Sequence, residues 1–297
     1  MAEARAIRDQ AGGQGLRLVP HPRREGQALL VTAGGAPFDE IAGLVERHRQ
    51  AGLDLLVRGE RVERVARLLE GPVLDGAPTV LVRGGGEETA AIGAGQRLLD
   101  LILGAVLLST LLPVLAAIAL AVKLTSRGPV LHRALVIGQS GQSFVWRKFR
   151  TMRVGAPADR HREAARRFIT GTDGDFRRTG VFKMQEDDRV TRVGALLRRH
   201  SLDELPQLFD VIAGRMSLVG PRPCLPYEWD LYAPHHRRRF DVKPGMTGLW
   251  QVLGRSRVDF EEMVFLDRCW AWNRSIGLYL GTLARTARVV LRGEGGY

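Results

Sequence analysis

Two adjacent carboxylates, Asp203 and Glu204, stand in a stretch where several chemically capable side chains come together. The basic pair Arg198 and Arg199 precedes them directly. Nearby positive charge keeps a carboxylate ionised, and an ionised carboxylate can attack phosphorus to form an acyl phosphate. A second carboxylate can hold Mg²⁺, which bridges phosphate oxygens. The pair therefore predicts metal-assisted phosphoryl transfer, with both acids as candidate metal ligands.

The same acids also have a purely structural interpretation. Ser201 and Glu204 have the spacing of a capping box, and acids in a first helical turn suit the helix dipole. Pro206 fits the first turn best if Asp203 itself is the cap. Apolar residues then follow at the spacing of a core-facing stripe: Leu205, Leu208, Phe209 and Ile212. We expect a helix to begin here, which is compatible with the chemical interpretation.

Isolated basic residues on turn-rich segments point to a phosphate pocket nearby. Arg222 lies between two prolines in "GPRP", and "RKFRTM" contains Arg147, Lys148 and Arg150. Arg255 ends the Gly- and Pro-punctuated stretch "VKPGMTGLWQVLGR". Cations held on rigid loops are more typical of phosphate recognition than of a solvated helical face.

An apolar run of 22 residues without a charge extends over residues 101–122. Its length matches the ~30 Å hydrocarbon core of a bilayer. Pro113 lies near the middle, and basic residues flank both ends, whereas the positive-inside rule expects them on one side. Two alternatives stay open: a spanning helix, or a helix that enters, bends at Pro113 and returns to the same anionic lipid surface.

The first 92 residues show the alternation of a small α/β domain. Apolar strand patterns and amphipathic helix patterns alternate as a βαβαβ series with a parallel sheet. The expected strands cover residues 28–32, 53–57 and 79–83, and the expected helices 38–50 and 61–70. A Gly-rich linker is expected from Gly84 to Gly95. We predict an accessory domain of unknown role over 1–92, and a second domain over 93–297 with a membrane helix over about 97–123.

Charge is distributed unevenly between the two regions. Residues 1–96 carry 12 basic and 13 acidic residues, whereas residues 97–297 carry 32 and 19. The basic region is therefore expected to meet anions such as lipid headgroups or phosphates. No nucleic-acid-binding motif is present, and the apolar run favours a membrane, so we exclude nucleic acid as a partner. The two cysteines lack metal or disulfide spacing, which suits a reducing compartment.

Aromatic residues near the C-terminus allow two interpretations. Trp270, Trp272 and Tyr279 either sit at headgroup level, where such rings are favoured, or pack in an ordinary core. The sequence favours neither alternative over the other.

Residues 96 to about 297 resemble the monotopic phosphoglycosyl transferases, the bacterial polyprenyl-phosphate sugar-1-phosphate transferases. The matching stretches occur in the family's order, and their joint match is specific: "RLLDLILG", "KFRTM", "RVTRVGALLRRHSLDELPQLF", "MSLVGPRP", "VKPGMTGLWQVLGR" and "RGEGGY". The resemblance implies a re-entrant membrane helix broken at Pro113, and a site at the cytoplasmic face of the bacterial inner membrane. It also implies transfer of a sugar-1-phosphate from a UDP-sugar to a polyprenyl phosphate, with release of UMP.

The resemblance also implies residue roles. Asp203 would attack the β-phosphate of the UDP-sugar to give an aspartyl phosphosugar, and Glu204 would help place Mg²⁺. Arg198, Arg222 and Arg255 would bind substrate phosphates. Lys148 and Asp267 match family positions near the pocket, with less defined roles.

Departures from the family pattern leave the acid pair untouched. They include Gln96 before the motif arginine, Leu112 before Pro113, Asp188 in place of a proline and Tyr279 in place of an acid. The alternative to an enzyme is a non-catalytic, membrane-docked scaffold of glycan assembly, and a homo-oligomer is left open.

Overall fold

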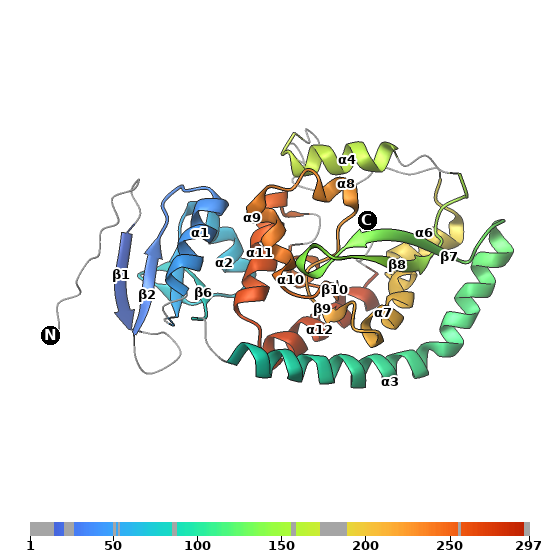
Figure 1. The fold of residues 1–297 in the computed structure, drawn as a ribbon, viewed down its shortest axis with the longest axis horizontal. Helices are drawn as coiled ribbons and strands as arrows, with labels where there is room; N and C mark the ends of the chain where they lie inside the picture. The colour runs from blue at the N-terminus through green and yellow to red at the C-terminus, as the bar shows by residue number, and fades with distance from the viewer. Residues whose placement is uncertain are drawn as a thin grey trace. The chain divides into compact units, whose positions relative to one another are not determined.

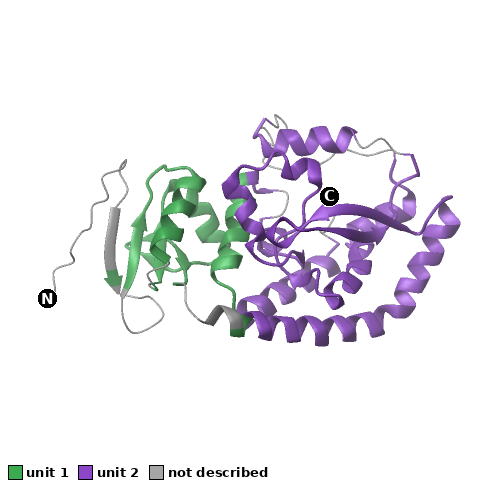
Figure 2. Cartoon of the chain, in the orientation of Figure 1, with its two compact units in different colours: residues 1–92, 261–275 green, residues 93–260, 276–297 purple. Residues whose placement is uncertain are grey.

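The computed structural model describes residues 15–20, 27–49, 52, 54–84, 88–155, 159–172, 189–254 and 257–293. The chain divides into two compact units, residues 1–92 with 261–275 and residues 93–260 with 276–297 (Figure 2). The expected boundary also followed residue 92, and the two expected domains stay a prediction. Most of helix α11 (Phe260–Trp272), however, groups with the first unit, although it lies within the expected second domain.

The first unit is built on a four-stranded sheet of order β1-β2-β3-β6. Its strands are β1 (Gly15–Pro20), β2 (Gln27–Thr32), β3 (Leu55–Arg58) and β6 (Val80–Val82), and its helices include α1 (Phe38–Arg49) and α2 (Glu60–Leu68). Strands β2 and β3 are parallel, as the βαβ pattern predicts. The expected all-parallel series is wrong at the last strand, because β6 is antiparallel to β3. The hairpin of β4 (Val73–Leu74) and β5 (Ala77–Pro78) adds one chain reversal after α2.

Helix α11 completes the core of the first unit. The ring centroids of Phe38 in α1 and Phe265 in α11 lie 4.9 Å apart. The indole Nε1 of Trp272 donates a hydrogen bond of 2.7 Å to Glu46, which also forms an ion pair with Arg268. These contacts join segments more than 200 residues apart, so the first unit depends on residues far along the chain.

The second unit combines a long helix with short strands and helices (Figure 1). Strands β7 (Leu131–Ile137) and β8 (Ser143–Phe149) form an antiparallel ribbon, and β9 (Ser217–Val219) pairs in parallel with β10 (Gly245–Thr247). The helices are α3 (Glu88–Thr125), η1 (Gln139–Gly141), α4 (Asp159–Ile169), α6 (Arg192–Arg199), η2 (Leu202–Gln207), α7 (Leu208–Ile212), α8 (Pro226–Trp229), α9 (Pro234–Arg237), η3 (Arg238–Asp241), α10 (Leu249–Leu253) and α12 (Ile276–Leu291).

Helix α3 is longer than the sequence pattern predicts. It begins at Glu88, so Gly93 and Gly95 are helical and the expected linker is wrong beyond residue 87. The span Ala91–Thr125 is long and apolar enough to cross a membrane, by length and composition. Pro113 lies inside the helix, where it supplies no backbone N–H, and α3 bends along its course in Figure 1.

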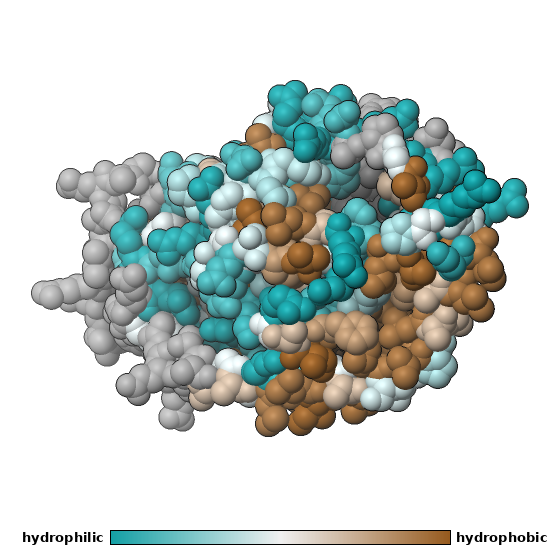
Figure 3. Space-filling view, turned by 45° about the vertical axis from the view of Figure 1, so that its right-hand side comes forward, coloured by the Kyte–Doolittle hydropathy of each residue, from teal (hydrophilic) through white to brown (hydrophobic). Residues whose placement is uncertain are grey.

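Much of the apolar surface of α3 is not covered by protein. Only 17% of its most apolar 18-residue window is buried. Figure 3 shows hydrophobic side chains gathered along the lower edge, where α3 runs in Figure 1. The exposed members are Leu98, Leu101, Ile102, Val106, Leu107, Leu112, Val114, Leu120 and Leu124. Such a continuous apolar surface is typical of membrane contact.

Both halves of α3 pack against the rest of the second unit. Near its start, the guanidinium of Arg97 donates to the carbonyls of Val211 and Ile212, at 2.6 and 2.8 Å. These carbonyls end α7, where that of Val211 also accepts the Gly214 amide at 3.0 Å, and a cation there suits the helix dipole. Near its end, α3 contributes to a buried cluster with β8 and α6. The cluster comprises Leu115, Ile118, Val122, Phe149 and Leu197.

Asp100 is a buried carboxylate on this apolar helix. Its Oδ1 accepts hydrogen bonds from the Ser217 hydroxyl at 2.9 Å, the Leu218 amide at 2.8 Å and the Tyr279 hydroxyl at 2.7 Å. The three donors satisfy a charge that would otherwise be costly to bury. Asp100 thereby joins α3 to β9 and α12.

The C-terminal aromatic residues belong to the core. Trp270, Trp272 and Tyr279 are 2%, 4% and 0% exposed. The core-packing interpretation is confirmed, and the headgroup interpretation is wrong. Residues 273–275 separate α11 from α12, so the stretch is two helices.

Candidate functional site

The acid pair lies on η2, a 3₁₀ turn between α6 and α7. Ser201, which precedes it, adopts a left-handed conformation with φ of 52°, and its side chain makes no capping hydrogen bond. A side-chain N-cap requires an extended backbone, so the predicted capping box is wrong. Ser201 instead reverses the chain at the end of α6. Pro206 lies inside the 3₁₀ turn, where no α-helical hydrogen bond is required of it.

The predicted apolar stripe is only partly correct. Leu208 is buried, but Phe209 is 49% exposed. The change from three residues per turn in η2 to 3.6 in α7 shifts the buried face. Asp210 and Val211 occupy that face, both 0% exposed.

Three cations from separate elements lie around the acids. Strand β8 packs against η2 and carries Lys148, α6 carries Arg198, and the loop after β9 carries Arg222. The guanidinium Nη1 of Arg222 donates to Oε1 of Glu204 at 3.2 Å. Arg198 Nε donates to the Thr151 hydroxyl at 2.9 Å, which fixes its side chain. The predicted residues from "RKFRTM", "LLRRH" and "GPRP" are thus brought together.

A buried indole supports two of these cations. Trp146 is 5% exposed, and its ring centroid lies 5.2 Å from Lys148 Nζ and 5.1 Å from Arg222 Cζ. An aromatic face attracts cations without neutralising them as a carboxylate would. Trp146 therefore orients two positive charges that stay available to an anionic ligand.

The acids and cations perturb one another's protonation. Burial, followed by the charge of Glu204, raises the pKa of Asp203 from 3.8 to about 6, although Lys148 and Arg198 oppose the rise. Burial, followed by the charge of Arg222, lowers the pKa of Lys148. Asp203 is thus a desolvated carboxylate next to cations, which is the state expected of a nucleophile toward phosphate.

A histidine that no sequence motif singles out also belongs to this region. His161 on α4 hydrogen-bonds the hydroxyl of Tyr227 on α8. Burial, and then the charges of Arg222 and Lys148, lower the pKa of His161 to about 4. It is therefore neutral at physiological pH and offers a polar group without adding charge. A lone histidine in an arginine-rich helix carries no signal from which this place could be predicted.

Other predicted residues have different places. Arg147 pairs with Asp210 at 2.8 Å, on the opposite face of β8 from Lys148, as strand alternation requires. Arg255 lies outside the described residues. Asp267 is a fully buried residue of α11 in the first unit, and its place at the substrate pocket stays a prediction.

The acid pair has the donor chemistry for a magnesium ion. Two neighbouring carboxylates supply hard oxygen ligands, which Mg²⁺ prefers. The charge of Glu204 helps to raise the pKa of Asp203, so the two groups repel, and a divalent cation would relieve that repulsion. The residues therefore fit the ion.

Comparison with known sequences identifies the family of the second unit. Residues 92–293 match the family described as "Bacterial sugar transferase". The chain belongs to the bacterial sugar transferase family. The match includes every residue of the acid and cation cluster described above. The resemblance predicted from the sequence motifs is confirmed.

Several named members of the family are similar to this chain. The "Undecaprenyl-phosphate galactose phosphotransferase" of Salmonella typhimurium is 39% identical over 57% of this chain and 35% of its own length. The "UDP-glucose:undecaprenyl-phosphate glucose-1-phosphate transferase" of Caulobacter vibrioides is 37% identical over 65% of this chain and 67% of its own length. The "Exopolysaccharide production protein ExoY" of Rhizobium meliloti is 38% identical over 71% of this chain and 93% of its own length. The match spans between 36% and 42% of the length of three other relatives.

Proposed function

We propose that this chain transfers a sugar-1-phosphate from a UDP-sugar to a polyprenyl phosphate, such as undecaprenyl phosphate, through an aspartyl phosphosugar. The observation that carries the proposal is the buried Asp203 beside Glu204, facing cations from three elements in a family of sugar transferases. The named relatives act on UDP-sugars and undecaprenyl phosphate or produce exopolysaccharide, so the product would enter a glycan assembly route.

In the first step, a carboxylate oxygen of Asp203 attacks the phosphorus that bears the sugar. The bond from that phosphorus to the bridging oxygen breaks, and UMP leaves with this oxygen and its electron pair. Lys148 and Arg222, held over Trp146, oppose the charge that develops on the leaving phosphate. Arg198, held by Thr151, provides a third positive charge at the end of α6.

In the second step, an oxygen of the polyprenyl phosphate attacks the same phosphorus. The bond between the Asp203 oxygen and phosphorus breaks, which regenerates the carboxylate and gives a polyprenyl-diphosphate sugar. The ion pair between Arg222 and Glu204, at 3.2 Å, keeps the second acid in place throughout. Asp203 and Glu204 would hold Mg²⁺, which would help to neutralise the charge of the substrate phosphates when bound.

The attachment of α3 supports a re-entrant rather than a spanning helix. Arg97 near its start and Val122 near its end both contact the second unit. A straight helix crossing a ~30 Å hydrocarbon core would carry its two ends to opposite surfaces. Contacts at both ends with one charged unit are easier to satisfy if the helix enters and returns at a single surface. We therefore place the second unit at the cytoplasmic face of the inner membrane, where UDP-sugars occur.

The test measures UMP release from a panel of UDP-sugars, with undecaprenyl phosphate and Mg²⁺. Wild type should release UMP with at least one donor, and Asp203→Asn should lose release by a factor of about 10³ or more, as expected for loss of a nucleophile. Asp230→Asn, which removes an exposed carboxylate of the same unit, is the matched control.

A second measurement tests the covalent intermediate. Without acceptor lipid, wild type should gain the mass of one sugar phosphate on the peptide that contains Asp203. Equal release by wild type and Asp203→Asn would exclude Asp203 as nucleophile. Absence of release with every donor would favour the scaffold alternative.

A further inference from the structure

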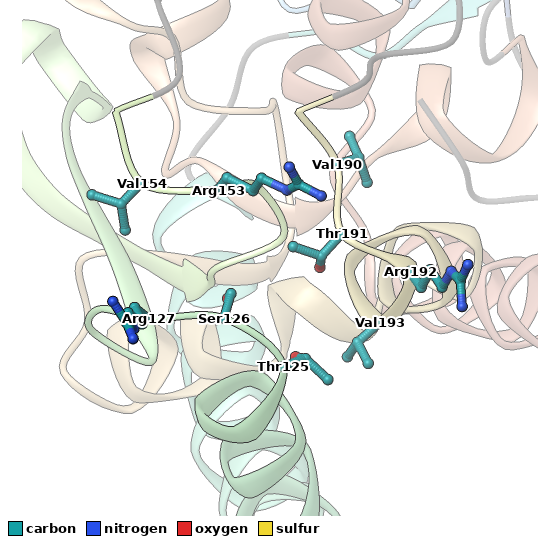
Figure 4. A pocket seen from close by; sticks show the side chains of 9 residues that line it. All are labelled: Thr125, Ser126, Arg127, Arg153, Val154, Val190, Thr191, Arg192 and Val193. Carbon is teal, nitrogen blue, oxygen red and sulfur yellow. The ribbon is translucent and has the colours of Figure 1, made fainter.

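A cavity of about 690 Å³ lies in the second unit, away from the acid pair. It is bounded by the end of α3, the segment after β8 and the start of α6 (Figure 4). Arg127, Arg153 and Arg192 are among its lining residues, together with residues that carry hydroxyl groups and valines; in Figure 4 the side chain of Arg192 points outward from the start of α6. None of the nine described lining residues is acidic. The cavity is therefore suited to an anion.

The start of α6 strengthens this preference. Thr191 caps the helix by accepting the Gly194 amide at 2.9 Å. The amides of Arg192 and Val193, in the first turn, have no intrahelical acceptor. Backbone donors and the positive end of the helix dipole thus lie at the same wall of the cavity as an arginine.

A buried cation behind the wall provides an independent indication. Arg150 is 7% exposed, and its Nη2 donates to the carbonyl and the hydroxyl of Ser126, at 2.7 and 2.9 Å. Within the described ranges, its Nε and Nη1 have no hydrogen-bond partner. Nη1 also lies close to the backbone of Gly128, so that a Cβ there would approach it to 2.4 Å. Arg150 therefore brings an incompletely compensated positive charge to the Ser126 wall.

The cavity also adjoins the apolar surface of α3. Thr125 in its lining is the last residue of that helix, and Ser126 follows it directly. Leu120 and Leu124 in those turns are 60% and 75% exposed. A ligand with a phosphate in the cavity could lay hydrocarbon along these side chains, whereas a soluble anion would leave them uncovered.

We propose that this cavity binds the phosphate group of a membrane lipid, as a site separate from the acid pair. Helix α6 separates the two: the cavity is at its start and the acids follow its end, about 12 Å along at 1.5 Å per residue. The proposal rests on the proposed membrane contact of α3 but not on the transfer chemistry. A bulk anionic phospholipid and a polyprenyl phosphate share this headgroup chemistry.

The test measures ligand binding by calorimetry on the full chain in an uncharged detergent. The probes are dioctanoyl phosphatidylglycerol, farnesyl phosphate, dioctanoyl phosphatidylcholine and inorganic phosphate. The pocket variant replaces Arg127, Arg153 and Arg192 with Gln. The control replaces Arg160, Arg166 and Arg167 with Gln, exposed residues of α4 that carry the same total charge.

We expect the phosphatidylglycerol or farnesyl phosphate probe to bind wild type and the control alike, and the pocket variant about tenfold or more weakly. The stronger of these two probes identifies the lipid source. Equal affinities in the pocket variant and control would overturn the proposal. Inorganic phosphate binding as tightly as the lipids would overturn the lipid assignment. Asp203→Asn should keep the affinity for phosphatidylglycerol, which is not a substrate of the proposed transfer, so failure of the transferase mechanism is distinguishable from failure of this site.

Discussion

Replacing Asp203 with Asn should stabilise the protein while abolishing its proposed chemistry. In the folded chain, burial and the charge of Glu204 raise the Asp203 pKa from 3.8 to about 6. The folded state therefore binds a proton that the unfolded state releases between these values, and the stability falls as pH rises through this window. Above pH 6 the ionised carboxylate costs up to about 3 kcal/mol, because a tenfold change in proton affinity corresponds to about 1.36 kcal/mol. Removing the charge should recover this energy.

The assay is thermal unfolding of wild type and Asp203→Asn as a function of pH. At pH 8 the Tm of the variant should exceed that of wild type by up to about 6–12 °C, since 1 kcal/mol shifts a domain of this size by about 2–4 °C. The gap should fall to roughly half by pH 5 and to roughly a fifth by pH 4, as wild-type Asp203 takes up its proton.

Asp210→Asn is the matched control, because Asp210 is also fully buried but is paired with Arg147 and Arg215. Loss of its charge leaves two cations facing each other, and should lower the Tm by several degrees at pH 8. A variant of Asp203 with a Tm at or below wild type at pH 8, or a gap that does not depend on pH, would refute this account of the site.

Two further substitutions test the surroundings of the site and the attachment of α3. Lys148→Met removes a cation that lowers the pKa of Asp203; the acidic limb of the UMP-release profile should therefore move to higher pH by about half a pH unit or more. An unchanged acidic limb would show that Lys148 does not influence the pKa of the nucleophile. Tyr279→Phe removes a hydrogen bond of 2.7 Å to the buried carboxylate of Asp100; unfolding free energy should fall by about 1.5–3 kcal/mol, measured as a lower Tm, and an unchanged Tm would show that water replaces the hydroxyl.

Local patterns predicted the central elements of the first unit and the apolar helix, but not strand β8 or helix α6, which carry Lys148 and Arg198. The βαβ order of β2, α1 and β3 follows from the alternation of apolar runs and amphipathic stretches, which is a property of neighbouring residues. The apolar helix was likewise predictable from hydropathy, and the acid pair from its basic surroundings. Glycines at 93 and 95 misled the placement of the helix start, because packing outweighs their weak helix propensity: a Cβ at Gly95 would lie 3.3 Å from Ile276.

Features that depend on distant residues escaped prediction. The antiparallel direction of β6 depends on an intervening hairpin of two-residue strands, too short to show alternation. His161 and Tyr227 are 66 residues apart, and neither belongs to a motif. The left-handed backbone at Ser201 replaces a local capping signal that the sequence fully satisfies. In each case, tertiary context overrides a local preference.

The carboxylate of Asp100 has a consequence for how the chain is made. Its partners Ser217, Leu218 and Tyr279 are synthesised between about 120 and 180 residues after it. Until then, Asp100, which directly precedes the uncharged run of residues 101–122, lacks these three hydrogen-bond donors, and burial of an unpaired carboxylate is costly. We therefore expect the start of α3 to reach its final packing only after most of the chain has been synthesised. Biogenesis is expected to be late and coupled to folding, rather than a helix insertion followed by folding of the remainder.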